Sequence, residues 1–175
     1  IGSSVAIKMK NIIGELNFYD PYVPSGYEKV LGANRFKSLN DMLAKSDIVS
    51  LHTPLNEETR GMVDEVFIKK LKKGSILINT SRGGIIKNLD CIHMGILSGK
   101  LGAVGLDVLP KEPPDRSSKE KLLLSWANDS KISNQIIINP HTSYYSPQSY
   151  EEMRYKAAKM SLDAMRGNLK HNRII

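Results

Sequence analysis

The sequence predicts an α/β fold, a doubly wound parallel sheet of the Rossmann type. Short apolar runs of strand length alternate with segments of helical periodicity along the chain. One run, ILI at residues 76–78, is continuously apolar, which is typical of a parallel strand buried on both faces. Polar residues follow several of these runs, and open α/β sheets bind ligands just outside the carboxyl ends of their strands.

The first expected elements are a helical pattern that ends near Gly14 and a strand over residues 16–20. Gly2 at a helix start, followed 18 positions later by Asp20, is the back half of a dinucleotide-binding fingerprint. The first strand and the first two glycines of that fingerprint are therefore expected before residue 1. On this interpretation the nucleotide-binding domain is N-terminally truncated.

Capping residues delimit the next elements. Ser38, with Asp41 three residues later, predicts a helix that ends near Lys45. A strand over residues 47–52 and an amphipathic helix over residues 63–73 follow, and they lead into the strand that begins at residue 75.

The second half of the chain repeats this alternation. A helix over residues 88–98 precedes a buried strand over residues 101–108. After a polar loop, a helix over residues 119–128 and a strand over residues 135–139 are expected.

The longest helix begins at Ser146 as its N-cap, with Pro147 at the first helical position, and ends at Gly167. Its predicted buried face carries Tyr150, Met153, Ala157, Met160 and Ala164.

Composition excludes several classes of protein. The 175 residues are 41% hydrophobic and 25% charged, as in ordinary globular proteins, and no apolar run approaches the roughly 20 residues that span a bilayer. Cys91 is the single cysteine, so no internal disulfide can form, which suits a reducing cytosol. The net charge of +7 fits either a nucleic acid or an anionic cofactor or substrate. The sequence carries no nucleic-acid-binding motif, which favours the anionic cofactor or substrate over a nucleic acid.

Five polar residues stand at or just past the carboxyl ends of expected strands: Asp20, Thr53, Arg82, Asp107 and His141. Together they predict one binding crevice at one edge of one sheet. The alternative for Arg82 is that it caps a helix or pairs on the surface, and for His141 that it is a satisfied structural group.

Three of the residues near this edge suit acid/base chemistry on an anionic substrate. Arg82 offers a planar fork that matches a carboxylate. A carboxylate such as Glu112 favours the imidazolium form of a nearby histidine, as a proton donor near neutral pH requires. With His141 as that histidine, the set suggests carbonyl reduction or alcohol oxidation.

Longer pieces match a known family: IGSSVA, FYDP, SDIVSLHTPLNEETRGMV, LKKGSILINTSRGGII, GKLGAVGLDVLPKEPP and INPHTSYYSPQSYEEMR. Over nearly its whole length the chain resembles the nucleotide-binding domain of the D-isomer-specific 2-hydroxyacid dehydrogenases. YDPY and YYSPQSYEEMR are most similar to the branch that holds the C-terminal-binding-protein corepressors. The chain departs from that branch at Tyr144, where those proteins carry Trp, and in a longer polar loop at residues 117–134.

The resemblance implies a role for each matching residue. Arg82 would hold the substrate carboxylate, His141 would be the general acid/base, and Glu112 would orient that histidine. The family's formate dehydrogenases carry Gln in place of Glu112, which favours a hydroxyacid substrate here. The cofactor NAD would contact Ile1 and Gly2 at its pyrophosphate, Asp20 at its adenine ribose, Asp107 at its nicotinamide, and Thr53, Thr59, Thr80, Arg82 and His141 along its slot.

The resemblance also implies a function and an organisation. Residues 1–145 would be the NAD-binding domain, and residues 146–175 a helix and tail that pack on a missing substrate domain. The activity would be hydride transfer between NAD and a small 2-oxo or 2-hydroxy acid, in a cytoplasmic homodimer with no metal and no membrane association. The alternative is a non-catalytic NAD-sensing binding protein like the corepressors. Expressed alone, the chain is expected to bind NAD weakly and to turn over no hydroxyacid.

Overall fold

The computed structural model describes residues 1–114 and 120–168, in two compact units, Ile1–Pro140 and His141–Ile175. Part of the predicted polar loop and residue 119 of the helix after it lie outside the described residues. Within the described residues, no helix is long and apolar enough to cross a membrane.

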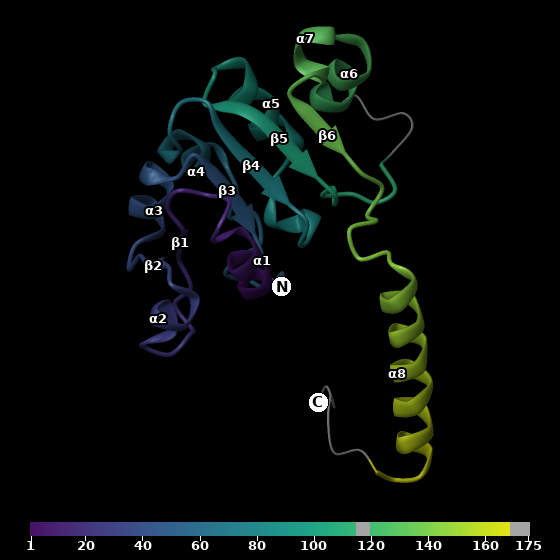
Figure 1. Cartoon of the computed structure of the whole chain (residues 1–175). Helices are drawn as coiled ribbons and strands as arrows, with labels where there is room; N and C mark the ends of the chain where they lie inside the picture. Colours follow the sequence, from purple (N-terminus) through teal and green to yellow (C-terminus); the bar gives the residue numbers. More distant parts are fainter. Residues whose placement is uncertain (115–119, 169–175) are drawn as a thin grey trace. The chain divides into compact units, whose positions relative to one another are not determined.

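The main sheet of the first unit is parallel, as predicted. Its order is β3 (Ile48–Leu51), β4 (Ser75–Asn79), β5 (Leu101–Leu106) and β6 (Ile136–Ile138), so each strand pairs with the next one along the chain (Figure 1). Every crossover between these strands carries a helix, which is the βαβ arrangement of doubly wound folds. The predicted fold class is therefore confirmed.

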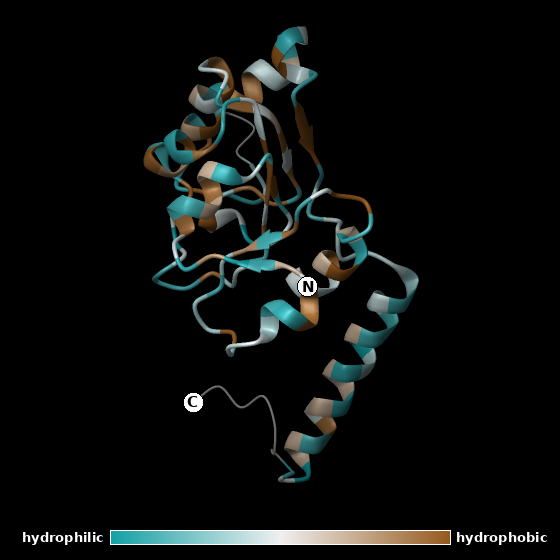
Figure 2. Ribbon diagram, turned by 60° about the vertical axis from the view of Figure 1, so that its left-hand side comes forward, coloured by the Kyte–Doolittle hydropathy of each residue, from teal (hydrophilic) through white to brown (hydrophobic). Residues whose placement is uncertain are grey.

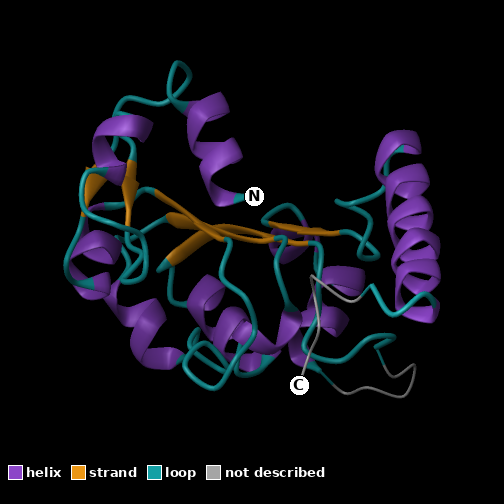
Figure 3. Ribbon diagram, turned by 90° about the horizontal axis from the view of Figure 1, so that it is seen from below, coloured by secondary structure: helices purple, strands orange, loops and turns teal. Residues whose placement is uncertain are grey.

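Helices α3 (Leu39–Lys45), α4 (Glu65–Lys70), α5 (Leu89–Leu97) and α6 (Lys121–Asn128) pack side by side in that order. Figure 3 shows most helices of this unit on one side of the sheet and α1, next to the N-terminus, on the other. The core between the helices and the sheet holds apolar side chains with almost no exposed surface: Leu43, Val63, Leu71, Leu77, Ile85, Ile86, Ile92, Leu101, Leu106 and Leu122.

Side-chain caps fix where several helices begin. Ser38 accepts a hydrogen bond from the amide of Asp41, so the predicted cap of α3 is confirmed. Asp64 accepts from two amides of the first turn of α4, both at 2.9 Å. As the N-cap, it sets the start of α4 at Glu65, two residues later than the predicted start at residue 63. At its other end α4 stops at Lys70 rather than at residue 73, because Leu71 adopts an extended conformation.

The start of the chain differs from the prediction. After α1 (Gly2–Met9), the strand β1 (Asn17–Phe18) pairs in parallel with β2 (Asn34–Arg35) in a sheet of its own, and α2 (Tyr27–Leu31) connects them. Asp20 therefore does not share a sheet with Arg82, contrary to the prediction of one continuous edge. Alternation of elements along the sequence does not determine which strands pair. In the doubly wound order one strand lies between such a pair and the remaining strands, and the described residues contain none there.

The second unit holds α8 (Pro147–Met165). Its predicted N-terminus is confirmed, since Ser146 and Ser149 form a reciprocal capping box with Pro147 at the first position. No residue of α8 is buried in this chain, so the packing of its predicted face on a further domain stays a prediction. Figure 2 shows hydrophobic residues only in scattered patches along this helix. Helical periodicity identifies the more apolar side of a helix, but burial also requires a neighbouring surface.

Candidate functional site

The chain turns sharply where β4 ends, and Asn79 holds that turn. The side chain of Asn79 is fully buried; its amide donates to the carbonyl of Arg82 at 3.0 Å, and its Oδ1 accepts from the amide of Ser81 at 3.0 Å. The turn leaves the guanidinium of Arg82 exposed, with Nη1 donating to the carbonyl of Ser81 at 2.8 Å. Arg82 thus stands at the carboxyl edge of the main sheet, as predicted.

The ends of β3 and β4 are joined at this edge. The hydroxyl of Ser81 donates to the carbonyl oxygen of Thr53, the second residue past β3. The hydroxyl of Thr53 is itself buried and finds no hydrogen-bond partner among the described residues. Buried polar groups are nearly always satisfied in native proteins, so an orphaned hydroxyl at a sheet's carboxyl edge indicates a place for a ligand.

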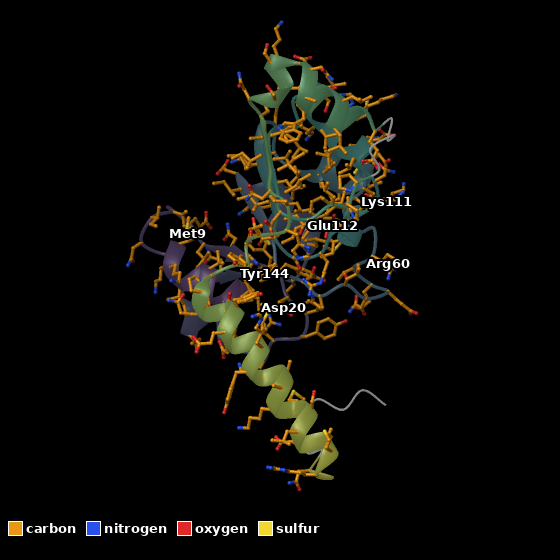
Figure 4. The ribbon with its side chains drawn as sticks, turned by 90° about the vertical axis from the view of Figure 1, so that its right-hand side faces the viewer. Met9, Asp20, Arg60, Lys111, Glu112 and Tyr144 are labelled. Carbon is orange, nitrogen blue, oxygen red and sulfur yellow. The ribbon has the colours of Figure 1, made fainter. Side chains whose placement is uncertain are left out.

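The loops after β4 and β5 meet backbone to backbone. A Cβ at Gly83 would stand 1.8 Å from the carbonyl oxygen of Leu109, so only glycine permits this approach. The amide of Leu109 donates to Oε1 of Glu112 at 2.7 Å, which anchors that carboxylate on its own loop. Figure 4 marks Glu112 and Lys111 in the loop that follows β5. The structure therefore brings the loops of Arg82 and Glu112 together.

The other two residues predicted along this edge have different surroundings. Asp107 is buried directly after β5, and its amide donates to the carbonyl of Asn79 at 2.9 Å, which extends the β4–β5 pairing. Thr80 lines a cavity of about 390 Å³ over β4, β5 and β6 whose walls are mostly apolar, among them Ile78 and Ile137. Both residues stand past the carboxyl ends of their strands, where the prediction put them.

Thr59 holds a local turn in the loop after β3. Its hydroxyl donates to the carbonyl of Pro54 at 2.6 Å and accepts from the amide of Asn56 at 3.0 Å. The neighbouring Glu58 accepts a hydrogen bond from the hydroxyl of Tyr22, which joins this loop to the one after β1. That hydrogen bond raises the pKa of Tyr22 above its ordinary value of 10.0.

Helix α1 begins beside the end of β3. A Cβ at Gly2 would lie 3.1 Å from Cβ of His52, the residue directly after that strand. Burial lowers the pKa of the His52 imidazole below its ordinary value of 6.5, and Nε2 of that ring lies 3.0 Å from Oγ of Ser50. Ile1 is the N-cap of α1, and its side chain accepts no hydrogen bond from the helix. The amides of the first turn of α1 are therefore not capped by a side chain, and they lie beside this edge. Sequence reasoning missed His52, although its place between β3 and Thr53 was a usable signal.

A second cavity, of about 620 Å³, lies at the carboxyl ends of β1 and β2. Asp20 lines it, and its Oδ1 accepts from the amide of Tyr22 at 2.8 Å. Arg35 crosses from β2 and donates to the carbonyls of Asp20 at 3.0 Å and Pro24 at 3.3 Å, so it holds the loop that carries Asp20. The remaining polar lining comes from Ser25, Glu28, Asn34 and Lys37. Sequence reasoning missed Arg35 and Lys37 because β2 is only two residues long and has no apolar run.

His141 is the first residue of the second unit and has an unusual backbone. Its φ of 56° places it in the left-handed region, which residues other than glycine rarely adopt and which often marks functional positions. Its ring meets the Tyr144 ring edge-on, with the centroids 6.0 Å apart. Since Arg82 and Glu112 belong to the first unit, the approach of His141 to them stays a prediction.

The sequence profile of one family, "D-isomer specific 2-hydroxyacid dehydrogenase, NAD binding domain", matches residues 1–143. The chain belongs to this family. The resemblance of the sequence is thus confirmed, and NAD is the cofactor of the domain.

Among curated relatives of this dehydrogenase domain, D-3-phosphoglycerate dehydrogenase of Methanocaldococcus jannaschii is 30% identical over 98% of the chain and 30% of its own length. C-terminal-binding protein 1 of Caenorhabditis elegans is 29% identical over 95% of the chain and 22% of its own length. The structure of D-lactate dehydrogenase from Aquifex aeolicus, complexed with NAD and lactic acid, superposes with a TM-score of 0.78 at 28% identity, over 97% of this chain and 52% of that one. The chain thus spans less than a third of these curated relatives and about half of this solved structure.

The described residues fit the NAD of this dehydrogenase family at two places. The buried hydroxyl of Thr53 lacks a protein partner and lies at the carboxyl edge of the main sheet. Asp20 lines a cavity at the carboxyl ends of β1 and β2, where dinucleotide-binding folds place the acid that binds the adenine ribose.

Proposed function

We propose that the protein carrying this chain transfers a hydride between NAD and small 2-oxo or 2-hydroxy acids. The observation that carries the proposal is the backbone contact between Gly83 and Leu109, because it joins the loop of Arg82 to the loop of Glu112. A guanidinium and a carboxylate on adjoining loops, at the edge where open α/β sheets bind ligands, suit an anionic substrate and a proton-transfer partner.

Each of the three catalytic candidates has one task. The planar fork of Arg82 would bind the substrate carboxylate in two places at once. His141 would accept the hydroxyl proton during oxidation and return it to the carbonyl oxygen during reduction. Glu112, held by the Leu109 amide, would favour the charged imidazolium and orient the ring. When bound, NAD supplies the acceptor for the hydride that leaves C2 of the hydroxy acid.

The remaining candidates would hold the cofactor. The carboxylate of Asp20 would accept from the ribose hydroxyls, and the hydroxyl of Thr53 would gain the partner it lacks. The start of α1, with Ile1 as N-cap and Gly2 as the first helical residue, would face the pyrophosphate. The remaining proposed cofactor contacts come from Thr59, Thr80 and Asp107. Thr59 would contribute by holding the turn that shapes the loop after β3.

A second candidate function is a non-catalytic NAD-binding protein. The similarity to C-terminal-binding protein 1 over nearly the whole chain favours it. Both candidates would bind NAD and keep Arg82, Glu112 and His141, so only turnover separates them.

The test is oxidation of NADH by the full-length protein with glyoxylate, pyruvate and hydroxypyruvate, followed by NADH absorbance. We expect Arg82→Lys to lower kcat/KM by about 10²-fold, since an ammonium cannot replace a two-point contact. Arg60→Lys, an exposed arginine on the loop after β3, is the matched control and should change kcat/KM less than about twofold. Absence of turnover with all three acids, combined with measurable NAD binding, would favour the second candidate.

Homodimer formation and a cytoplasmic location remain predictions of the resemblance. So does the proposal that residues 146–175 pack on a substrate domain. The exposed apolar residues of α8, among them Met153, Leu162 and Met165, are consistent with such packing.

A further inference from the structure

We propose that Lys37 determines how strongly this pocket discriminates NAD from its 2′-phosphorylated form, NADP. The inference rests on the proposed role of Asp20 at the adenine ribose. The four residues that follow Asp20 in the chain, at 21–24, include no basic side chain, so the sequence around Asp20 by itself favours NAD over NADP. The structure brings one in from β2.

The pairing of β1 with β2 sets Lys37 beside Asp20. The strands are parallel, with Phe18 opposite Arg35, and the amide of Phe36 donates to the carbonyl of Phe18 at 2.9 Å. Two residues beyond each paired position stand Asp20 and Lys37, so they occupy equivalent places on adjacent strand ends, where strands run about 4.8 Å apart. Both line the cavity of about 620 Å³.

Of the charged residues in that lining, Lys37 differs in having no partner within the described part of the chain. Arg35 is engaged by the carbonyls of Asp20 and Pro24. Glu28 accepts from the amide of Gly26 at 3.1 Å. Lys37 is exposed and makes no hydrogen bond or ion pair with any residue that the structure describes. Its ammonium is therefore available to a ligand in the cavity.

The two strand ends then act on a 2′ substituent in opposite directions. The carboxylate of Asp20 accepts from a ribose 2′-hydroxyl and repels a 2′-phosphate, whereas a basic group nearby accommodates that phosphate. A phosphate carries up to two negative charges, so Lys37 should improve binding of NADP on the order of three- to tenfold. NAD has no charge at this position and should gain less than about twofold.

The experiment compares the affinities of the full-length protein for NAD and NADP by titration calorimetry at low and at moderate salt. Lys37→Gln should weaken the binding of NADP on the order of three- to tenfold and leave the affinity for NAD nearly unchanged. The effect on NADP binding should shrink as the salt concentration rises. Lys29→Gln, on the exposed surface of α2 and outside the cavity lining, removes the same charge and should alter neither affinity.

Two results would overturn the inference: equal changes for both cofactors on Lys37→Gln, or no change for either. Asp20→Asn tests the proposed role of Asp20 separately, and it should increase the affinity for NADP relative to that for NAD. If Asp20→Asn has that effect and Lys37→Gln has none, this inference alone fails. If Lys37→Gln acts selectively and Asp20→Asn does not, the role of Lys37 is supported and the assignment of Asp20 falls.

Discussion

Replacing Gly83 by alanine should destabilise the protein and disturb the proposed site together. The added Cβ would stand 1.8 Å from the carbonyl oxygen of Leu109, 2.2 Å from its carbon and 2.8 Å from the nitrogen of Pro110. Moving that Cβ out to a bare contact of 3.0 Å requires a displacement of at least about 1.2 Å. All three obstructing atoms are backbone, so no side-chain rotation can relieve the contact.

The cost follows from that rigidity. Overpacking of well-packed regions lowers the free energy of unfolding by about 1–3 kcal/mol, and a clash with the backbone of the Leu109–Pro110 peptide belongs at the upper end, near 3 kcal/mol. For a domain of this size that corresponds to a drop in Tm of roughly 6–12 °C. Because the amide of Leu109 anchors Glu112, the same displacement should also lower turnover.

Thermal unfolding and urea titration of Gly83→Ala would measure the loss. Gly84→Ala is the matched control, since its Cβ would meet Cδ2 of Leu55 at 3.0 Å and Cδ1 at 3.3 Å, the ends of a flexible side chain. We expect Gly84→Ala to cost less than about 1 kcal/mol. Equal stability of the two variants would refute the claim that a close backbone contact joins the two loops.

Three further predictions concern the acid/base pair and stability. His141→Asn should lower turnover by about 10²–10⁴-fold, and asparagine tolerates the left-handed backbone at this position. Glu112→Gln should shift the pH profile of kcat/KM. An unchanged profile would remove Glu112 from the mechanism. Asp64→Ala should cost about 1–2 kcal/mol in urea unfolding, because two amides of α4 lose their cap, whereas Asp64→Asn should retain most of it. Burial lowers the pKa of His52 in the folded protein, so below its ordinary value of 6.5 the unfolded chain binds the proton first and stability falls as pH falls. His52→Gln should flatten that loss between pH 6.5 and the lower pKa of the folded state, and an identical pH dependence in both proteins would contradict the assignment.

The parts of the fold that the sequence predicted well are those that local physics determines. The apolar run of β4 is too continuous for a half-exposed strand, and the structure buries alternate residues fully and the others at least partly. Ser38 can satisfy an amide at the start of α3 without any tertiary contact. Both features needed only their neighbours in sequence, and both were predicted correctly.

The missed features depend on pairing between distant segments. β2 is two residues long, Asn34 and Arg35, and no hydrophobic pattern can identify a strand of that length. Missing β2 also meant missing Arg35 and Lys37 as lining of the Asp20 cavity. The prediction of one continuous sheet was wrong for a related reason: β1 and β2 form a sheet of their own, and strand order is a property of tertiary packing, not of the alternation of elements.

The residues proposed to bind the acid and those proposed to bind the adenine ribose lie at different sheets. On the main sheet, Gly83 and Leu109 bind the loops of Arg82 and Glu112 into one structure, so the substrate anchor and the orienting carboxylate should respond together to a change in either loop. On the small sheet, Arg35 holds the loop of Asp20 through two carbonyls, and neither of those contacts includes a residue of the main sheet. Sites that share no partners respond to substitution nearly additively. Selectivity between NAD and NADP can therefore change at the end of β2 without a change in the residues proposed to bind the acid.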